Sequence, residues 1–400
     1  MHRFTRTRPR VLVLSASLAA LIACQGDRSG RAVTVTDSAG VRVTISRDGP
    51  RTFAEVLPDP VLSLGGADIS GPAQFSNIRG VRVDSRGNLW VADGGSGEVR
   101  IFRPDGTHWK TIGGPGEGPG EFRRIRLLGA FRGDTVAFWD DSNPRLTLLG
   151  PDGGFVRTVT RSWGDEVPPL AVDVFRDGTI LARAVRVFFA ASLPRGQAVT
   201  DTTMLFRLDV AGGPLQPQAR ARGRSWAWTG RTQVPVPFTI DPGFDLDGDA
   251  VHLAAGPEFR IRVFEDGRLT EVYGVSREAR KVTRADEAAY RALFERALAD
   301  SVLRREYLSM LGHPSQPGFL PAYSRILVAE DGKVWAQVYA PDLLAPAVWD
   351  VFAADREWLG QVRTPAGFSV EAIAGDELVG VWRDELLVEY VRVYRLVTSG

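Results

Sequence analysis

The charged residues with the clearest chemical potential occupy matching positions in six short apolar segments that recur along the chain. Three are carboxylates and three are arginines, and the segments contain no histidine. Carboxylate oxygens are the ligands that Ca²⁺ prefers in proteins. Guanidinium groups would instead pair with those carboxylates or bind an anionic ligand. The acids are Asp173, Asp241 and Glu371, and the bases are Arg79, Arg126 and Arg325.

Two interpretations of these residues stay open. If Asp173, Asp241 and Glu371 converge, they form an oxygen site for a divalent ion such as Ca²⁺. If they pair with the three arginines, they line a water-filled channel, and any surplus positive charge favours an anionic ligand. Apart from this Ca²⁺ option, the sequence predicts no cofactor.

The remaining reactive residues form no recognisable catalytic pattern. His108, His252 and His313 are scattered and have no partner at metal-ligand spacing. We find no nucleophile elbow and no phosphate-binding loop. Trp226 and Trp228 lie in an apparent insertion and could stack on a ligand. The chain is therefore more easily interpreted as a binding protein than as an enzyme.

The elements that would position these residues are short strands joined by tight turns. The clearest unit spans residues 75–122. Within it, 80–84, 89–93, 98–103 and 109–112 are strand-like, and Gly and Asp-Gly turns separate them. Four short strands in about 45 residues are typical of one blade of a β-propeller.

This unit resembles an NHL repeat, and the resemblance rests on particular residues. They are Gly80-Val81-x-Val83-Asp84, Gly87-Asn88-Leu89-Trp90-Val91-Ala92-Asp93, Val99-x-Ile101-Phe102, Asp105-Gly106 and Gly118-Pro119-Gly120-Glu121-Phe122. The resemblance implies a propeller that serves as a binding platform or, in some relatives, as an enzyme, so it does not by itself select a function.

The second-strand pattern of this unit recurs five times, at residues 133–140, 177–182, 247–253, 331–337 and 375–382. The fold class predicted is therefore all-β, a six-bladed β-propeller over residues 33–400. Its innermost strands are expected near 79–83, 125–130, 169–173, 239–244, 323–328 and 369–373. The last blade lacks a fourth strand, and residues 60–65 are expected to supply it, which removes two exposed sheet edges. Residues 33–46 predict an additional hairpin.

Three insertions break the repeat, at residues 184–203, 214–236 and 275–322. All three are expected on the same face of the propeller, which we call the upper face. The third contains one predicted helix over 283–312, between blades four and five, with Thr283 as N-cap and Asp286 three residues later. The helix either covers the channel mouth, covers a sheet edge, or docks a protein partner.

The N-terminus has the features of an export signal. Residues 1–23 carry four arginines, then an apolar run too short to span a membrane as a helix. The run ends Leu21-Ile22-Ala23-Cys24, which resembles the bacterial lipobox, and Cys24 is the one cysteine of the chain. The resemblance implies lipid attachment at Cys24 and a tether over 24–32. It also implies a location in the cell envelope, in the outer membrane and facing the periplasm.

The charge balance of the sequence bears on which class of partner the protein binds. Without residues 1–23 the chain has 45 basic and 48 acidic residues, a net charge of −3, which argues against nucleic acid as a partner. The function expected is a periplasmic binding or scaffolding propeller whose upper face takes a small molecule or a protein. A hydrolase or lyase with a channel-bound divalent ion and an inert envelope lipoprotein are the alternatives.

Overall fold

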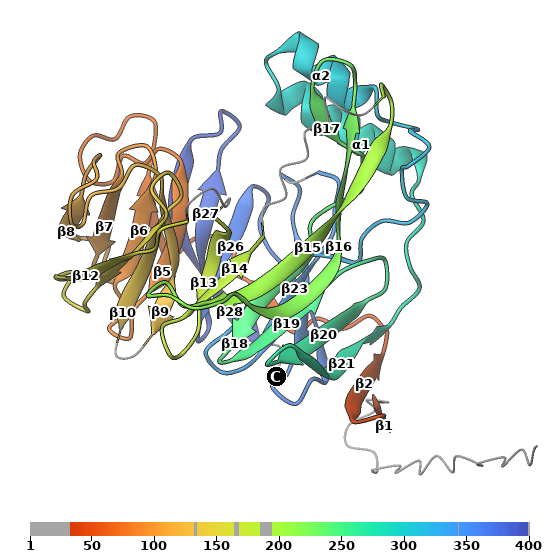
Figure 1. The fold of residues 1–400 in the computed structure, drawn as a ribbon, viewed down its shortest axis with the longest axis horizontal. Coiled ribbons are helices and arrows are strands. Elements are labelled where there is room, and N and C mark those ends of the chain that lie inside the picture. Colours follow the sequence, from red (N-terminus) through yellow and green to blue (C-terminus); the bar gives the residue numbers. More distant parts are fainter. Residues whose placement is uncertain (1–32, 132–133, 164–167, 185–193, 343, 399–400) are drawn as a thin grey trace, which may run out of the picture.

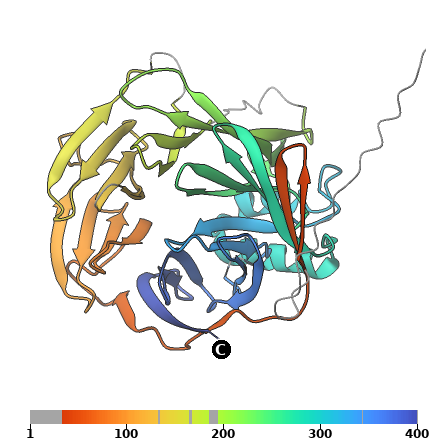
Figure 2. The ribbon, with the colours of Figure 1, turned by 90° about the horizontal axis from the view of Figure 1, so that it is seen from below.

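The computed structural model describes residues 33–398, except for 132–133, 164–167, 185–193 and 343. The signal segment 1–23, Cys24 and the tether 24–32 therefore lie outside the described residues, as do residues 185–193 of the first insertion. The described chain forms six sheets arranged around a central axis (Figure 2). All residue ranges given below are those of the structure.

The first sheet contains β5 (Ile78–Val83), β6 (Leu89–Asp93), β7 (Glu98–Phe102) and β8 (His108–Gly113). The second contains β9 (Ile125–Phe131), β10 (Thr135–Asp140), β11 (Arg145–Leu149) and β12 (Phe155–Thr160). The third contains β13 (Leu170–Val174), β14 (Ile180–Arg183), β15 (Ala198–Leu208), β16 (Gln216–Trp228) and β17 (Gln233–Pro235).

The fourth sheet contains β18 (Gly243–Asp247), β19 (Ala250–Ala254), β20 (Arg260–Glu265) and β21 (Arg268–Ser276), followed by β2 (Val41–Arg47) and β1 (Val33–Ser38). The fifth contains β22 (Tyr323–Val328), β23 (Val334–Val338), β24 (Val348–Phe352) and β25 (Trp358–Arg363). The sixth contains β26 (Phe368–Ala374), β27 (Glu377–Arg383) and β28 (Glu389–Thr398), with β3 (Ala54–Val56) and β4 (Leu62–Gly65) on its outer side.

The ring closes through both its inner and its outer strands. The innermost strands β5, β9, β13, β18, β22 and β26 neighbour one another in that order, and β26 lies next to β5. On the outside, β4 pairs antiparallel with β28, with Leu62 opposite Val393 and Gly65 opposite Tyr390. This confirms the prediction that residues 60–65 complete the last sheet. Pairing the two ends of the chain removes an exposed sheet edge at the junction.

The turn between β5 and β6 shows why the NHL-like unit has Asp84, Gly87 and Asn88 at these positions. The carboxylate of Asp84 accepts hydrogen bonds from the Asn88 backbone (2.8 Å), the Asn88 side chain (2.8 Å) and the Trp90 indole (3.1 Å). Gly87 adopts φ +80°, which favours glycine. One buried carboxylate thus holds the turn and the first residues of β6 together.

Replacing Asp84 with alanine should lower the free energy of unfolding by about 1–3 kcal/mol, because several buried donors lose their acceptor. Urea unfolding at neutral pH measures this loss. The matched control is Asp105→Ala in an exposed turn of the same sheet, where the carboxylate serves only Thr107. Equal losses for the two variants would show that the Asp84 turn carries no special stability.

The predicted helix is two helices in the structure. α1 (Arg284–Ala297) begins at the Thr283 N-cap, and the expected capping box with Asp286 is present. α1 ends at its C-cap Leu298, whose backbone is extended, and Asp300 then begins α2 (Ser301–Leu308) by accepting hydrogen bonds from the backbone of Val302 and Leu303. The single helix predicted over 283–312 is therefore interrupted by a second N-cap, Asp300.

The two helices lie to one side of the ring (Figure 1). Their apolar residues cluster with Phe238, Leu320 and Tyr339, and Met310 and Tyr307 pack on β16 and β17. No residue of α1 or α2 lines the channel cavity described below. The helices therefore cover the last strand of the third sheet and do not lie across the channel mouth.

Two further expectations need correction. Residues 214–236 do not lie between sheets, because they form β16 and β17 of the third sheet, whose long β15–β16 ribbon reaches the helices (Figure 1). The fourth innermost strand is Gly243–Asp247 rather than 239–244. Pro242 precedes this strand, and the Asp247-Gly248 turn ends it, so its start lies four residues later than predicted.

The expected N-terminal hairpin is present as β1 and β2. Its docking position was not predictable, since β2 adds in parallel to β21 at the outer edge of the fourth sheet. Apolar clusters fill the spaces between neighbouring sheets, and they contain five fully buried tryptophans of the ten in the sequence.

Candidate functional site

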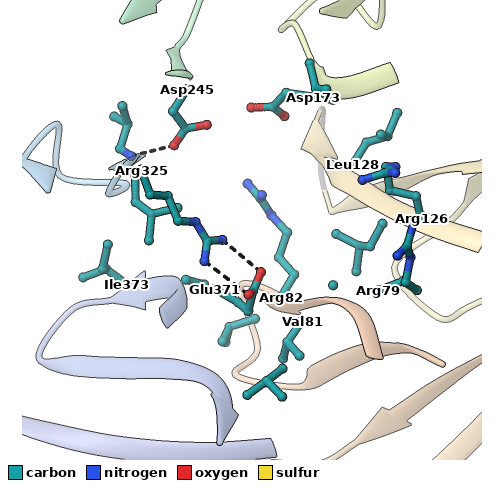
Figure 3. A pocket seen from close by; sticks show the side chains of 18 of the residues that line it. Arg79, Val81, Arg82, Arg126, Leu128, Asp173, Asp245, Arg325, Glu371 and Ile373 are labelled. Carbon is teal, nitrogen blue, oxygen red and sulfur yellow. Dashed lines mark hydrogen bonds and ion pairs between the residues drawn. The ribbon is translucent and has the colours of Figure 1, made fainter. Parts of the chain in front are cut away.

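A cavity of about 430 Å³ runs along the central axis between the innermost strands (Figure 3). All six strands contribute to its wall, and most of their polar side chains are charged. They are Arg79 and Arg82 from β5, Arg126 from β9, Asp173 from β13, Asp245 from β18, Arg325 from β22 and Glu371 from β26.

β-bulges explain why so many charged side chains face this channel. The pairing of an inner strand with its neighbour shifts register between Ile78 and Val81, between Tyr323 and Arg325, and between Val370 and Ala372. A bulge adds one unpaired residue and changes which side chains point to each face. Glu371 is itself the unpaired residue of its strand, and the bulge at residues 79–80 lets both Arg79 and Arg82 line the cavity.

The channel begins, on the face that carries the helices, with two arginines that share one carboxylate. Arg126 Nη2 lies 2.8 Å from Asp141 Oδ2, and Arg79 Nη2 lies 3.6 Å from the same oxygen. The Asp141 side chain is only 4% exposed, whereas those of Arg79 and Arg126 are 31% and 30% exposed. One buried negative charge thus faces two accessible positive charges, and the cluster has a net charge of +1.

Deeper in the channel, Arg325 and Glu371 neutralise each other. The two guanidinium nitrogens donate to the two carboxylate oxygens at 3.3 and 3.0 Å. Such a two-point pair is geometrically well defined. It occupies both charges, so it adds no net charge to the cavity.

Asp173 and Asp245 face each other across the junction of the third and fourth sheets (Figure 3). Burial and then the neighbouring Asp245 charge hold the pKa of Asp173 well above its usual range, although Arg82 opposes this rise. Burial also raises the pKa of Asp245, against a hydrogen bond of 2.7 Å from the Val328 backbone. The proximity of two buried carboxyl groups therefore disfavours the state in which both are ionised.

The structure separates the three carboxylates of the possible metal site. Asp173 and Glu371 line the channel, but Asp241 lines a different cavity and pairs with Arg183 at 3.0 Å. Glu371 is already engaged by Arg325. Within the described ranges, no group of three or more His, Cys, Asp and Glu side chains is placed to hold a metal ion.

Of the six charged residues singled out in the sequence, the structure brings Arg79, Arg126, Arg325, Asp173 and Glu371 to the channel. Asp245 and Arg82 were missed. The Asp247-Gly248 turn marks the end of this inner strand in the sequence. Side chains two residues apart in a strand point to the same face, so Asp245 could have been placed on the face of Asp247. Arg82 carried no such signal, since its direction depends on the bulge.

The other candidates have structural roles or lie elsewhere. Trp226 and Trp228 flank the buried Ala227 on β16 and line neither the channel nor the second cavity. Asp93 and Asp140 hold turns: Asp93 accepts hydrogen bonds from the backbone of Ser76 and Gly95, and Asp140 accepts them from several backbone amides.

The histidines stay apart in the structure as well. His252 is buried and bonded to the Tyr273 hydroxyl, His313 contacts the Gly196 carbonyl, and His108 is exposed.

Comparison with known proteins supports the NHL-like repeat, and the solved structures that resemble this chain do so only at low sequence identity. Residues 75–102 match the NHL repeat family. No curated protein sequence matches the chain. A putative exported protein from Bacteroides fragilis is similar at 11% identity, with a TM-score of 0.47, and 87% of this chain and 96% of that chain are covered.

Two solved enzymes are similar at the same distant level. A gluconolactonase from Xanthomonas campestris has 15% identity and a TM-score of 0.43, over 81% of this chain and 87% of that chain. A virginiamycin B lyase from Staphylococcus aureus has 10% identity and a TM-score of 0.39, over 80% and 95%. These values assign no activity to this chain. With the repeat at residues 75–102 and its ring of sheets, the chain is an NHL-repeat-like β-propeller.

Proposed function

We propose that this protein is an envelope-anchored binding propeller, a closed ring of six blades that takes a small anionic ligand at the upper mouth of its channel. The observation that carries this proposal is the pair Arg79 and Arg126, which share the single carboxylate of Asp141. Both guanidinium groups stay about one-third exposed, so each keeps N–H donors for a ligand. An anion with two or more oxygens would complete the charge balance of this cluster.

The two alternatives are less well supported. A channel-bound divalent ion would need Asp241 in the channel, and Asp241 lies in another cavity. An inert propeller would gain more stability from an apolar channel, because partly buried charges cost desolvation free energy. The retention of seven charged side chains on the innermost strands around one cavity favours a role in binding.

The binding test uses citrate and inorganic phosphate as probes, titrated calorimetrically into the purified protein at low ionic strength. Arg79→Gln should weaken citrate binding about 10-fold or more, since a charge-assisted hydrogen bond is lost. Arg126 and Asp141 stay paired in this variant, so the fold is preserved. Arg157→Gln, on the exposed strand β12, is the matched control and should bind like the unaltered protein. Failure of both probes to bind, or equal binding by both variants, would refute the proposal.

The anchor is a separate expectation, which rests on the lipobox-like Leu21-Ile22-Ala23-Cys24. Intact mass analysis of the protein from bacterial membranes should show a chain that begins at Cys24 and carries acyl mass. Cys24→Ser should abolish both the processing and the added mass. A chain cleaved elsewhere, without acyl mass, would contradict it. No helix in the described part of the chain is both long and apolar enough to span a membrane.

A further inference from the structure

A second cavity, of about 470 Å³, lies on the upper face, beside the helices. Its walls come from β15 and β16, from residues 238–242 before β18, from the β19–β20 loop, and from residues 314–321 after α2. It shares no lining residue with the channel. Its volume falls within the range of small-molecule sites, roughly 300–1,000 Å³.

Proline and aromatic residues make up the apolar part of the cavity wall, beside the polar side chains of Thr200, Thr239, Asp241, Ser315 and Gln316. Five prolines line it, and each has a fixed φ angle, so the surrounding backbone is preformed. Three aromatic side chains complete the walls. Phe238 and Tyr323 are buried at the base, whereas Phe319 is 41% exposed. Flat aromatic and proline surfaces favour a flat apolar ligand.

Phe238 is held in an unfavourable backbone conformation. Its φ is +59°, a left-handed value that costs a bulky residue about 1–3 kcal/mol. The ring packs on Tyr290 of α1 with 5.5 Å between centroids, so the helical insertion holds this residue in place. The insertion thus has a structural consequence beyond covering an edge, because it positions the base of this cavity.

Among the described residues, the charged groups that line this cavity are Asp241, which has a charged partner, and Arg222, for which no ion pair is seen. Asp241 is neutralised by Arg183 at 3.0 Å. Arg222 projects from β16 and is exposed, and within the described part of the chain its guanidinium donates to the Thr200 hydroxyl at 3.4 Å. A ligand with an anionic group could pair with this guanidinium while its apolar body fills the cavity.

We propose that this cavity is a second ligand site, specific for a flat aromatic acid whose ring lies among Phe238, Phe319 and Tyr323 and whose anionic group pairs with Arg222. This site is independent of the proposed anion site in the channel. Its ligand differs in chemistry, because the channel is lined by many charged side chains, whereas this cavity combines aromatic and proline surfaces with the Arg222 guanidinium.

The test uses 2-naphthoate, an aromatic ring system with one carboxylate, titrated calorimetrically into the purified protein. We expect one site per chain. Ala255→Trp places an indole in the cavity and should abolish binding, and Arg222→Gln should weaken it about 10-fold. Arg220→Gln, an exposed arginine on the same strand that does not line the cavity, is the matched control.

The outcomes separate the two proposed sites. Arg79→Gln should leave naphthoate binding unchanged, and Ala255→Trp should leave citrate binding unchanged. If Ala255→Trp disturbs the fold, seen as a lower melting temperature, Arg222→Gln against Arg220→Gln still decides. Absence of naphthoate binding, or binding that neither Ala255→Trp nor Arg222→Gln weakens, would overturn the second site without affecting the first.

Discussion

Replacing Asp350 with alanine should lower the free energy of unfolding by about 3–5 kcal/mol, the largest loss that we expect from one side chain. Asp350 is fully buried in β24. Its carboxylate accepts hydrogen bonds from the Tyr323 hydroxyl (3.0 Å), the Trp358 indole (3.1 Å) and the Gln361 amide (3.0 Å). It also pairs with Arg277 at 2.9 Å. Removing it leaves these donors and one partly buried cation without their acceptor.

The same network joins parts of the chain that are far apart in sequence. Arg277 also pairs with Asp48 at 2.8 Å, just after the N-terminal hairpin, and its guanidinium lies 4.5 Å from the centre of the Phe259 ring. The hydrogen bonds to Asp48 and Asp350 raise the pKa of Arg277 above its ordinary value, although burial opposes this, so the side chain stays positively charged. The Asp350 variant should therefore loosen the contact between the fourth and fifth sheets and the hairpin together.

Urea unfolding followed by tryptophan fluorescence measures the Asp350 effect. Asp331→Ala, in an exposed turn of the same sheet, is the control, and it should change the unfolding free energy by less than about 1 kcal/mol. A combined Asp350→Leu and Arg277→Met variant should lose less than the sum of the two single changes, because it removes both charges. A loss below 1 kcal/mol for Asp350→Ala would show that the network is not cooperative.

Acidification from pH 7 to pH 5 should destabilise the protein through His252 by roughly 2 kcal/mol. Burial and then the positive charge of Arg356 lower the pKa of His252 to about 3, although Asp247 opposes the shift. Its Nδ1 lies 2.7 Å from the Tyr273 hydroxyl. The unfolded chain has a histidine pKa near 6.5, so below that pH the unfolded state binds a proton that the folded state excludes.

The stability that the neutral His252 contributes is lost as the pH falls. His252 contributes its full stability above about pH 6.5, and that contribution falls as the pH drops toward the folded pKa of about 3. His252→Gln does not titrate and should flatten the pH dependence of the unfolding free energy. His108→Gln, at an exposed site, should leave the dependence unchanged. The measurement is urea unfolding at several pH values, and parallel curves for unaltered protein and His252→Gln would exclude this role.

The sequence alone determined the features that depend on short-range pattern. Alternating strand patterns and Asp-Gly turns identified the NHL-like unit. The turn held by Asp84 could be predicted from the sequence because its partner Asn88 is only four residues away. The capping residues Thr283 and Asp286 located the start of α1. The closing strand at 60–65 was predictable because it mirrors residues 110–114, which end the first unit.

Only the tertiary structure decided which charged side chains meet. A bulge shifts the face of every residue beyond it, so the presence of Arg82 beside Arg79 in the channel depends on a pairing irregularity that the sequence does not display. A displacement of the fourth inner strand put Asp245 where Asp241 was expected. The contacts of Arg277 with Asp48 and Asp350 span 229 and 73 positions of chain, and separations of that size are set by the closure of the ring rather than by local preference.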